Sequence, residues 1–392
     1  MSHPVPTEAQ IVDALRSVQE PELWRDIVDL DMVRSVQIDT TKDGSMATVA
    51  IALKVDLDPV GDELADSVGA ALQAIDGIAG VRVNFEPMDD DERRLLKARL
   101  KEGWGTHEKA GEHGHGHAAG PAEAAPFMQP GSKTRVLGIS SGKGGVGKSS
   151  TTVNLAIALA QRGLHVGVLD ADVYGFSIPK MMGVDQAPTV IDGLVIPPVS
   201  YGVSAMSMGF LVEEDRAIIW RGPMLHKALE QFLTDVYWGE PDFLLIDMPP
   251  GTGDVALSMS QYLPRTEVII VTTPQAAAQR VAQRSASMAR AQQVNLQVQG
   301  VIENMSWFTG DDGKRYQIFG SGGGAELAKT LGVPLLGEIP LVPALREGMD
   351  IGIPITISDP ESEASKAYAA MAKTICTELG PKRRYKRELR VS

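Results

Sequence analysis

The sequence predicts an α/β protein in which a parallel sheet, covered by helices on both faces, follows a small α+β domain. Three observations predict it. Short aliphatic runs alternate with helical stretches from residue 135 onward, as expected of strands buried on both faces of a parallel sheet. A complete phosphate-binding motif lies between the first run and the helix after it. The first 100 residues instead mix helical periodicity with strand alternation.

The small α+β domain is expected over residues 1–102. Thr7 opens a helical pattern, and Glu20, Pro21 and Glu22 end it. Further elements are predicted as strands at 33–38, 47–53 and 81–85, a helix at 64–75 and a charged helix at 90–101. Residues 103–133 lose all periodicity and are rich in Gly, Ala, Pro and His. That composition cannot bury enough apolar surface to become ordered, so a flexible linker is predicted there.

The P-loop domain is expected over residues 134–380, followed by a basic tail at 381–392. Its predicted strands are residues 136–140, 166–170, 243–247, 268–272 and 298–304. The first helix is predicted at 148–162. Ligands of such sheets bind beyond the carboxyl ends of the strands, and the nucleotide-site motifs lie at those ends.

The phosphate-binding motif matches the pattern G-x-x-x-x-G-K-[ST] in full. It consists of Gly142, Lys143, Gly144, Gly145, Val146, Gly147, Lys148 and Ser149, and Ser150 completes the expected nucleotide contacts. Glycines let the backbone turn its N–H groups toward phosphates, and the helix N-terminus adds the positive end of its dipole. We expect this loop to bind ATP, with Lys148 reaching the β- and γ-phosphates and Ser149 binding Mg²⁺.

Three aspartates at strand ends complete the predicted ATP site. Asp247 ends the run 243–247 and is expected to hold Mg²⁺ directly or through water. Asp170 and Asp172 end the strand after the P-loop helix. One of this pair is expected to position the attacking water, and Asp170 is also a candidate metal ligand. Gly251, in the loop after Asp247, could offer its N–H to the γ-phosphate.

Composition narrows the class of protein. The chain has 392 residues and a net charge of −13, which argues against non-specific binding of nucleic acid. Its single cysteine, Cys376, allows no disulfide within the chain and no cysteine-only metal site, and its helical spacing predicts a buried apolar position. No run of eighteen apolar residues and no signal peptide is found. A soluble cytoplasmic protein is expected.

The loop sequence K-G-G-V-G-K-S resembles the deviant P-loop of the ParA/MinD-type ATPases. That resemblance implies that Lys143 reaches across a homodimer interface to the partner's nucleotide. It also favours Asp172 as the residue that positions water.

Longer strings are similar to those of the Mrp/ApbC family of iron–sulfur cluster carrier ATPases. They are residues 170–175 (DADVYG), 220–224 (WRGPM), 247–254 (DMPPGTGD), 303–306 (ENMS) and 319–324 (FGSGGG). This family implies delivery of clusters to apoprotein clients, and it places an adenine-reading Asn at Asn304. Residues 7–90 resemble the small domain often fused in front of it, although Asp31 stands where the family usually has Gly.

The thiols that the family uses for its cluster are absent. A Cys-Pro-x-Cys pair usually follows the ENMS string, but residues 307–313 read WFTGDDG. The small domain's usual Cys-Pro is Asp58-Pro59. Carboxylates are poor ligands for a cluster built on thiolate chemistry. The prediction that this chain carries an iron–sulfur cluster therefore rests on its resemblance to the family alone.

Two alternatives stay open beside the cluster carrier: a ParA-like positioning ATPase, and an Mrp-like ATPase that has lost cluster binding and acts on a client protein. The linker histidines could bind a metal ion, although a solvated tract is favoured. The basic run 382–387 could contact an acidic partner or serve as a solubilising tail. It has no apolar stripe, which argues against a membrane anchor.

Overall fold

The structure is a computed structural model that describes residues 5–41, 44–56, 58–102, 105–106, 123–124, 126–129, 131–172, 175–211, 222–251, 254–292 and 294–379. It divides into two compact units. Unit 1 contains residues 1–132, 186–199 and 230–240, and unit 2 contains the remainder. Most of the expected linker and the whole basic tail lie outside the described residues.

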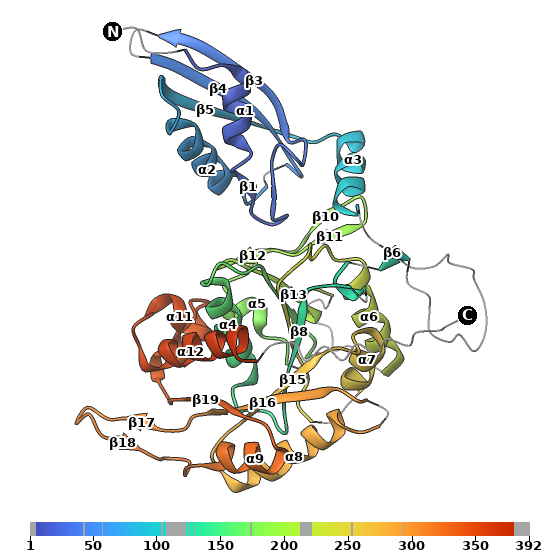
Figure 1. Cartoon of the computed structure of the whole chain (residues 1–392), viewed down its shortest axis with the longest axis vertical. Coiled ribbons are helices and arrows are strands. Elements are labelled where there is room, and N and C mark those ends of the chain that lie inside the picture. The colour runs from blue at the N-terminus through green and yellow to red at the C-terminus, as the bar shows by residue number, and fades with distance from the viewer. Residues whose placement is uncertain are drawn as a thin grey trace, which may run out of the picture. The chain divides into compact units, whose positions relative to one another are not determined.

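The N-terminal part of unit 1 is an α+β fold whose sheet has the order β3-β4-β5 (Figure 1). β3 and β4 pair antiparallel, whereas β4 and β5 pair parallel through the crossover helix α2. The elements are α1 (Glu8–Leu15), β1 (Gln19–Glu20), β2 (Arg25–Asp26), β3 (Val33–Thr41), β4 (Gly44–Leu53), α2 (Gly61–Gln73), β5 (Ile78–Pro87), α3 (Asp90–Leu100), β6 (Gly105–Thr106), β7 (Glu123–Ala124) and η1 (Pro126–Met128). Thr7 caps α1 in a capping box with Gln10, as its position predicts.

Asp31 occupies a left-handed backbone position, with φ +60°. Glycine adopts this region without strain, and aspartate is one of the few other residues that tolerate it. This conformation accounts for the residue types found at the position: the usual glycine of the resembling family and the aspartate of this chain. The Asp31 carboxylate also accepts a hydrogen bond from Arg99 at 2.9 Å.

A buried charge cluster lies in the same unit. The Lys54 side chain is fully buried and donates to Glu20 and to Glu22, the latter at 2.6 Å. Asp58 Oδ2 lies 3.5 Å from Lys54 Nζ. That separation is an ion pair rather than a hydrogen bond, so Oδ2 has no donor in the described structure. Three buried carboxylates therefore share one ammonium group.

Two segments distant in sequence belong to unit 1. β10 (Thr189–Ile191) and β11 (Leu194–Ile196) form an antiparallel hairpin. Four buried side chains pack into the same hydrophobic cluster as the N-terminal core: Ile191, Leu194, Ile196 and Tyr237. Lys97 Nζ donates to the Asp192 carbonyl at 2.5 Å, and Tyr237 donates to the Leu23 carbonyl at 3.3 Å. The sequence patterns did not predict this grouping.

Unit 2 is built on the predicted parallel sheet, with strand order β12-β13-β9-β14-β8-β15-β16-β19. The six neighbouring pairs from β13 to β19 are parallel. The strands are β8 (Arg135–Ser141), β9 (Val166–Asp170), β12 (Val199–Ser200), β13 (Val203–Ser207), β14 (Phe243–Asp247), β15 (Glu267–Thr272), β16 (Gln297–Asn304) and β19 (Leu335–Ile339). The five predicted strands are confirmed, whereas β12, β13 and β19 were missed.

Helices cover both faces of this sheet, as predicted. α4 and α12 gather on one side, and α8 and α9 lie on the other (Figure 1). The helical elements are α4 (Lys148–Ala160), α5 (Ile178–Met181), η2 (Met208–Leu211), α6 (Gly222–Thr234), α7 (Asp254–Tyr262), α8 (Ala276–Ala289), α9 (Gly323–Leu331), α10 (Pro343–Asp350), α11 (Ile355–Ser358) and α12 (Glu363–Thr377). A hairpin of β17 (Phe308–Thr309) and β18 (Arg315–Tyr316) extends from the body.

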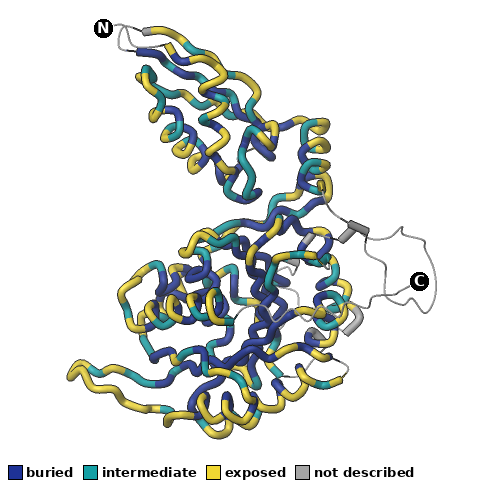
Figure 2. Tube along the Cα trace, viewed as in Figure 1, coloured by how far each residue is buried: buried dark blue, intermediate teal, exposed yellow. Residues whose placement is uncertain are grey.

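The core of unit 2 follows the sheet. The central strands and α4 are dark blue in Figure 2, and β9, β14 and β15 are buried at every position. Burial on both faces explains why these strands read as continuous aliphatic runs. Among the described residues, no helix is both long and apolar enough to cross a membrane.

The buried cluster predicts a pH-dependent stability for unit 1. Burial raises the pKa of Glu22 from about 4.5 to about 6, and the attraction of Lys54 opposes this rise only in part. A raised carboxyl pKa contributes stability that is complete below the unfolded pKa and is lost as pH rises through the folded one. From about pH 4 to about pH 8 this loss should amount to about 2 kcal/mol.

Glu22→Gln removes this titration. Its free energy of unfolding should therefore fall less than that of the parent chain over this pH range, by about 2 kcal/mol. Hydrogen-exchange protection of β4 amides in the full chain, corrected for intrinsic rates, measures the difference. Glu8→Gln, at an exposed position of α1, is the matched control. Parallel pH curves for Glu22→Gln and the parent chain would contradict the prediction.

Candidate functional site

The phosphate-binding loop connects β8 to α4. Gly147 is the N-cap of α4 and has φ +79°, and Gly145 has φ +76°. A Cβ on Gly147 would lie 2.1 Å from Asn304 Nδ2, and one on Gly142 would lie 2.3 Å from the Ala282 nitrogen. These glycines are therefore required by backbone conformation and by close approach, independently of any ligand.

Asp247, at the carboxyl end of β14, is fully buried and binds three side chains of α4. Its Oδ2 accepts hydrogen bonds from Lys148 Nζ at 2.5 Å and from Ser149 Oγ at 2.6 Å. Its Oδ1 accepts one from Thr152 Oγ1 at 2.7 Å. The predicted partners Lys148, Ser149 and Asp247 are thus brought together, and a buried ammonium neutralises the buried carboxylate.

Thr152 was not singled out from the sequence. It follows Lys148 by one helical turn, so both side chains project from the same face of α4. That spacing, combined with a carboxylate expected at the end of β14, is the signal that could have identified it.

Asp170 lies beside Asp247 on the neighbouring strand, because the two residues are direct partners in the β14–β9 register. Burial and the Asp247 carboxylate raise the pKa of Asp170 to about 7. Its two oxygens accept from the backbone N–H groups of Asp172, Ser177 and Ile178 at 3.0–3.2 Å and from Ser207 Oγ at 3.2 Å. Asp170 therefore anchors the loop after β9.

Asp172 is buried near the phosphate-binding loop, with Oδ2 3.7 Å from Lys148 Nζ.

The Lys143 side chain, in contrast to that of Lys148, is exposed. It makes no ion pair or hydrogen bond within the described part of the chain. The loop holds Lys143 through its backbone, where the Ser141 hydroxyl donates to its carbonyl at 3.1 Å.

Asn304 ends β16 and braces the phosphate-binding loop. Its Nδ2 donates to the Val146 carbonyl at 2.9 Å, and its Oδ1 accepts from the Met305 N–H at 2.9 Å. The backbone thus uses both ends of the amide. A contact between Asn304 and an adenine base stays a prediction.

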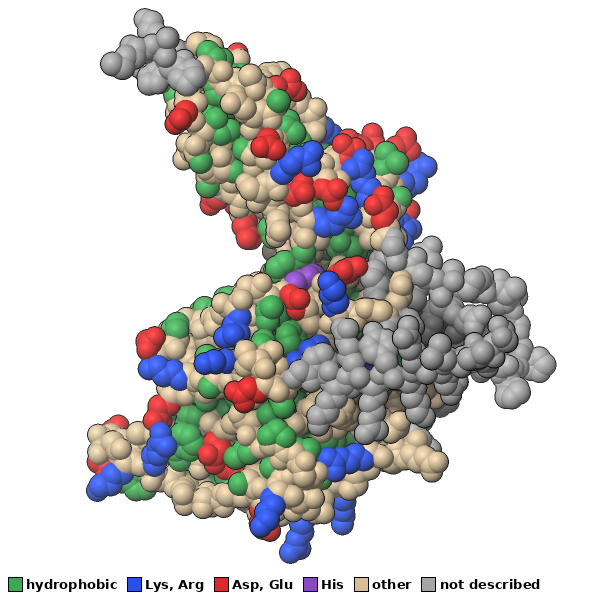
Figure 3. Space-filling view, in the orientation of Figure 1, with side chains coloured by type: hydrophobic (Ala, Val, Ile, Leu, Met, Phe, Trp, Pro, Cys, Tyr) green, Lys and Arg blue, Asp and Glu red, His purple; other side chains and the backbone are tan. Residues whose placement is uncertain are grey.

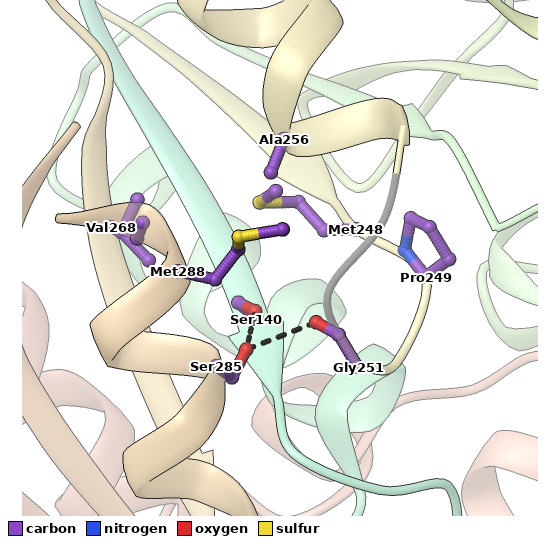
Figure 4. A pocket seen from close by; sticks show the side chains of 9 residues that line it. Ser140, Met248, Pro249, Gly251, Ala256, Val268, Ser285 and Met288 are labelled. Carbon is purple, nitrogen blue, oxygen red and sulfur yellow. Dashed lines mark hydrogen bonds between the residues drawn. The ribbon is translucent and has the colours of Figure 1, made fainter. Parts of the chain in front are cut away.

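In the loop after Asp247, both backbone polar groups of Gly251 are hydrogen-bonded. The Gly251 N–H donates to the Ser141 carbonyl at 2.8 Å, and its carbonyl accepts from Ser285 Oγ at 3.1 Å. Ser140 Oγ lies 3.1 Å from Ser285 Oγ. Figure 4 shows both serines beside a small cavity whose lining includes Met248 and Met288. Gly251 has φ +94°, which favours glycine. The N–H predicted to reach a γ-phosphate is therefore bonded to the strand that leads into the phosphate-binding loop.

The donor chemistry fits magnesium and a polyphosphate. Ser149, Asp170 and Asp247 offer hard oxygens of the kind that Mg²⁺ prefers. The glycine-rich loop and the N-terminus of α4 suit phosphate oxygens. No group of three or more His, Cys, Asp or Glu side chains among the described residues could form a metal site, so magnesium would also need ligands from the nucleotide and water.

Comparisons with known proteins agree with this chemistry. A family model described as NUBPL iron-transfer P-loop NTPase matches residues 132–376, and a second, iron-sulfur cluster assembly protein, matches residues 8–85. An iron-sulfur cluster carrier protein of Mycobacterium tuberculosis is 44% identical over 94% of this chain and 93% of its own length. One from Synechocystis is 39% identical over 94% and 97%.

Among solved structures, a nucleotide-binding protein of Archaeoglobus fulgidus in complex with ADP is similar to part of this chain. It is 34% identical and superimposes with a TM-score of 0.51 over 60% of this chain and 93% of its own.

Thr152 provides a direct test of the Asp247 arrangement. Thr152→Val keeps the side-chain volume but leaves Oδ1 of a buried carboxylate without its donor, which should cost about 1–3 kcal/mol of unfolding free energy. Thr152→Ser keeps the hydroxyl and should cost less. Urea denaturation of the full chain compares the two variants. A valine variant as stable as the serine variant would refute the contribution assigned to this hydrogen bond.

Proposed function

Because the chain belongs to the NUBPL iron-transfer P-loop NTPase family, we propose that it is an ATP-hydrolysing iron–sulfur cluster carrier that delivers clusters to apoproteins. The proposed ATP binding and hydrolysis is supported by one observation: Lys148, Ser149 and Thr152 all bind the buried Asp247. The carrier half is supported by similarity to cluster carrier proteins along almost the whole chain. We further propose that it acts as a homodimer in the cytoplasm.

Phosphate binding would change the partner of Lys148. Its ammonium group neutralises Asp247 at 2.5 Å, and the same group is the expected ligand of the β- and γ-phosphates. Ser149, Asp247 and Asp170 would hold magnesium, which supplies positive charge to the phosphate oxygens. Lys148 can then leave Asp247 without stranding an unpaired buried charge, a loss that would otherwise cost several kcal/mol.

Hydrolysis would use Asp172 and Lys143. The Asp172 carboxylate lies 3.7 Å from Lys148 Nζ, which supports a role in positioning water beside the terminal phosphate. Lys143 is exposed, so it is accessible to a second subunit. In a two-fold dimer each subunit would supply one Lys143 and receive one, and a cation acting in trans can contribute roughly 10³ to 10⁵ in rate.

A positioning ATPase that binds nucleic acid is less well supported. On the face in Figure 3, basic and acidic side chains of the described residues are interspersed rather than gathered by sign. The net charge of −13 also opposes attraction to a polyanion.

One assay tests both halves of the proposal. ATP turnover and cluster delivery to a four-cysteine apo-ferredoxin are measured in the same samples. Lys148→Ala should lose ATP binding and both activities. Lys143→Ala should bind ATP almost normally and lose turnover. Mixing the two variants should restore part of the turnover and delivery, because one subunit binds ATP while the other supplies Lys143.

Native mass spectrometry confirms that heterodimers are present in the mixture. With heterodimers confirmed, no gain on mixing would overturn the trans role of Lys143. If the parent chain hydrolyses ATP but delivers clusters equally well with and without ATP, hydrolysis is not coupled to cluster transfer.

A further inference from the structure

Iron–sulfur clusters are normally held by four cysteine thiolates. This chain has one cysteine, so a symmetric dimer offers two at most. A four-thiolate site therefore cannot be assembled from this chain alone, even in a dimer. Two segments of this chain stand where the resembling family has its thiols: residues 307–313 and Asp58-Pro59.

The first of these positions, the segment after the ENMS string, forms the β17–β18 hairpin. Its base is fixed by one carboxylate: Glu363 accepts from Trp307 Nε1 at 3.2 Å, Thr309 Oγ1 at 2.9 Å and Arg315 at 3.0 Å. The Arg315 guanidinium also lies 4.2 Å from the centre of the Trp307 ring. The hairpin is therefore held by hydrogen bonds and a cation–π contact.

The tip of the hairpin has no thiol, and its acidic side chains, Asp311 and Asp312, offer hard oxygens. Asp312 accepts from the Lys314 N–H at 3.1 Å and from the Tyr316 hydroxyl at 2.9 Å, and it pairs with the Lys314 ammonium at 3.3 Å. Its oxygens are engaged within the hairpin. Carboxylates also match poorly the thiolate chemistry of a cluster.

The second of these positions is Asp58, which belongs to the buried charge cluster of unit 1. Its side chain is fully buried and faces Lys54 at 3.5 Å. The same ammonium group binds Glu20 and Glu22. A positive charge thus already occupies the centre of this group of carboxylates, so a cationic iron centre would have to displace Lys54.

The single thiol lies elsewhere. Cys376 is on α12, half-buried, and packs against the hydrophobic core of unit 2. A half-buried thiol against apolar side chains behaves as a small hydrophobe rather than as a ligand. It also has no second thiol of its own chain with which to share an iron.

We propose that the cluster this chain delivers is held by thiolates of another molecule, either a small thiol or the cysteines of the protein that brings or receives the cluster. This inference rests on the proposed carrier function. Transfer is then a ligand exchange without redox change. Each iron–sulfur bond to a donor thiolate breaks as one to a receiving thiolate forms, and the proton of the receiving thiol passes to the released thiolate.

The test is anaerobic reconstitution of the full chain with ferrous iron and sulfide, followed by desalting, iron analysis and absorption spectroscopy. One sample contains the chain alone, a second adds glutathione, and a third adds apo-ferredoxin before gel filtration. Ferredoxin alone is the control for cluster assembly. The chain alone should retain no stoichiometric iron and no cluster absorption. Cluster should elute with the chain in the glutathione sample or the ferredoxin sample, and which of them does so identifies the thiol source.

A stable cluster on the chain alone would overturn the inference. Loss of cluster retention in Cys376→Ser would also overturn it, because that cysteine would then be a ligand. If no sample retains a cluster on the chain while ATP-dependent delivery proceeds, the inference fails and the carrier function stands. If delivery is also absent, the proposed function itself fails, in favour of an ATPase that acts on a client protein without a cluster.

Discussion

The ion pair between Lys148 and the buried carboxylate of Asp247 is the interaction on which the nucleotide site depends. An aspartate at 0% exposure is costly unless its charge is matched. Here α4 supplies the match, with one ammonium group and two hydroxyls from Lys148, Ser149 and Thr152. The same contacts attach the start of α4 to the end of β14. The arrangement of charges in the site and the packing of the P-loop helix on the sheet are therefore one feature.

In the charge cluster of unit 1, buried carboxylates are neutralised in a different way. Lys54 is shared among Glu20, Glu22 and Asp58, so carboxylates outnumber cations and burial raises the pKa of Glu22 to about 6. In unit 2, by contrast, a phosphate ligand and a metal ion can take over the charges of Lys148 and Asp247. That difference favours a structural role for the first cluster and a functional one for the second.

Sequence patterns predicted what depends on local chemistry. The five aliphatic runs became β8, β9, β14, β15 and β16 because strands buried on both faces need apolar side chains throughout. Two of the missed strands break that pattern: β13 (Val203–Ser207) contains two serines, and β19 (Leu335–Ile339) contains Gly337 and Glu338. In both, the sheet overrides a weak local signal.

Long-range partners could not be predicted in this way. The local sequence places only Asp58 near Lys54, four residues along the chain, whereas Glu20 and Glu22 come from a distant segment. The grouping of residues 186–199 and 230–240 with the N-terminal core likewise depends on contacts between distant segments. The predicted site residues Lys148, Ser149, Asp170, Asp172 and Asp247 do lie together, because parallel strands end at one edge of the sheet. Thr152 was missed because its partner is specified only in three dimensions.

The most direct measurement is the affinity for a fluorescent ATP analogue with and without magnesium, in the parent chain and in Asp247→Asn. If Asp247 passes from Lys148 to a nucleotide-bound magnesium ion, magnesium should tighten binding to the parent chain by at least about tenfold, or about 1.4 kcal/mol. The asparagine variant should still bind the analogue but gain less than about twofold from the metal. An equal magnesium gain in both proteins would contradict the account.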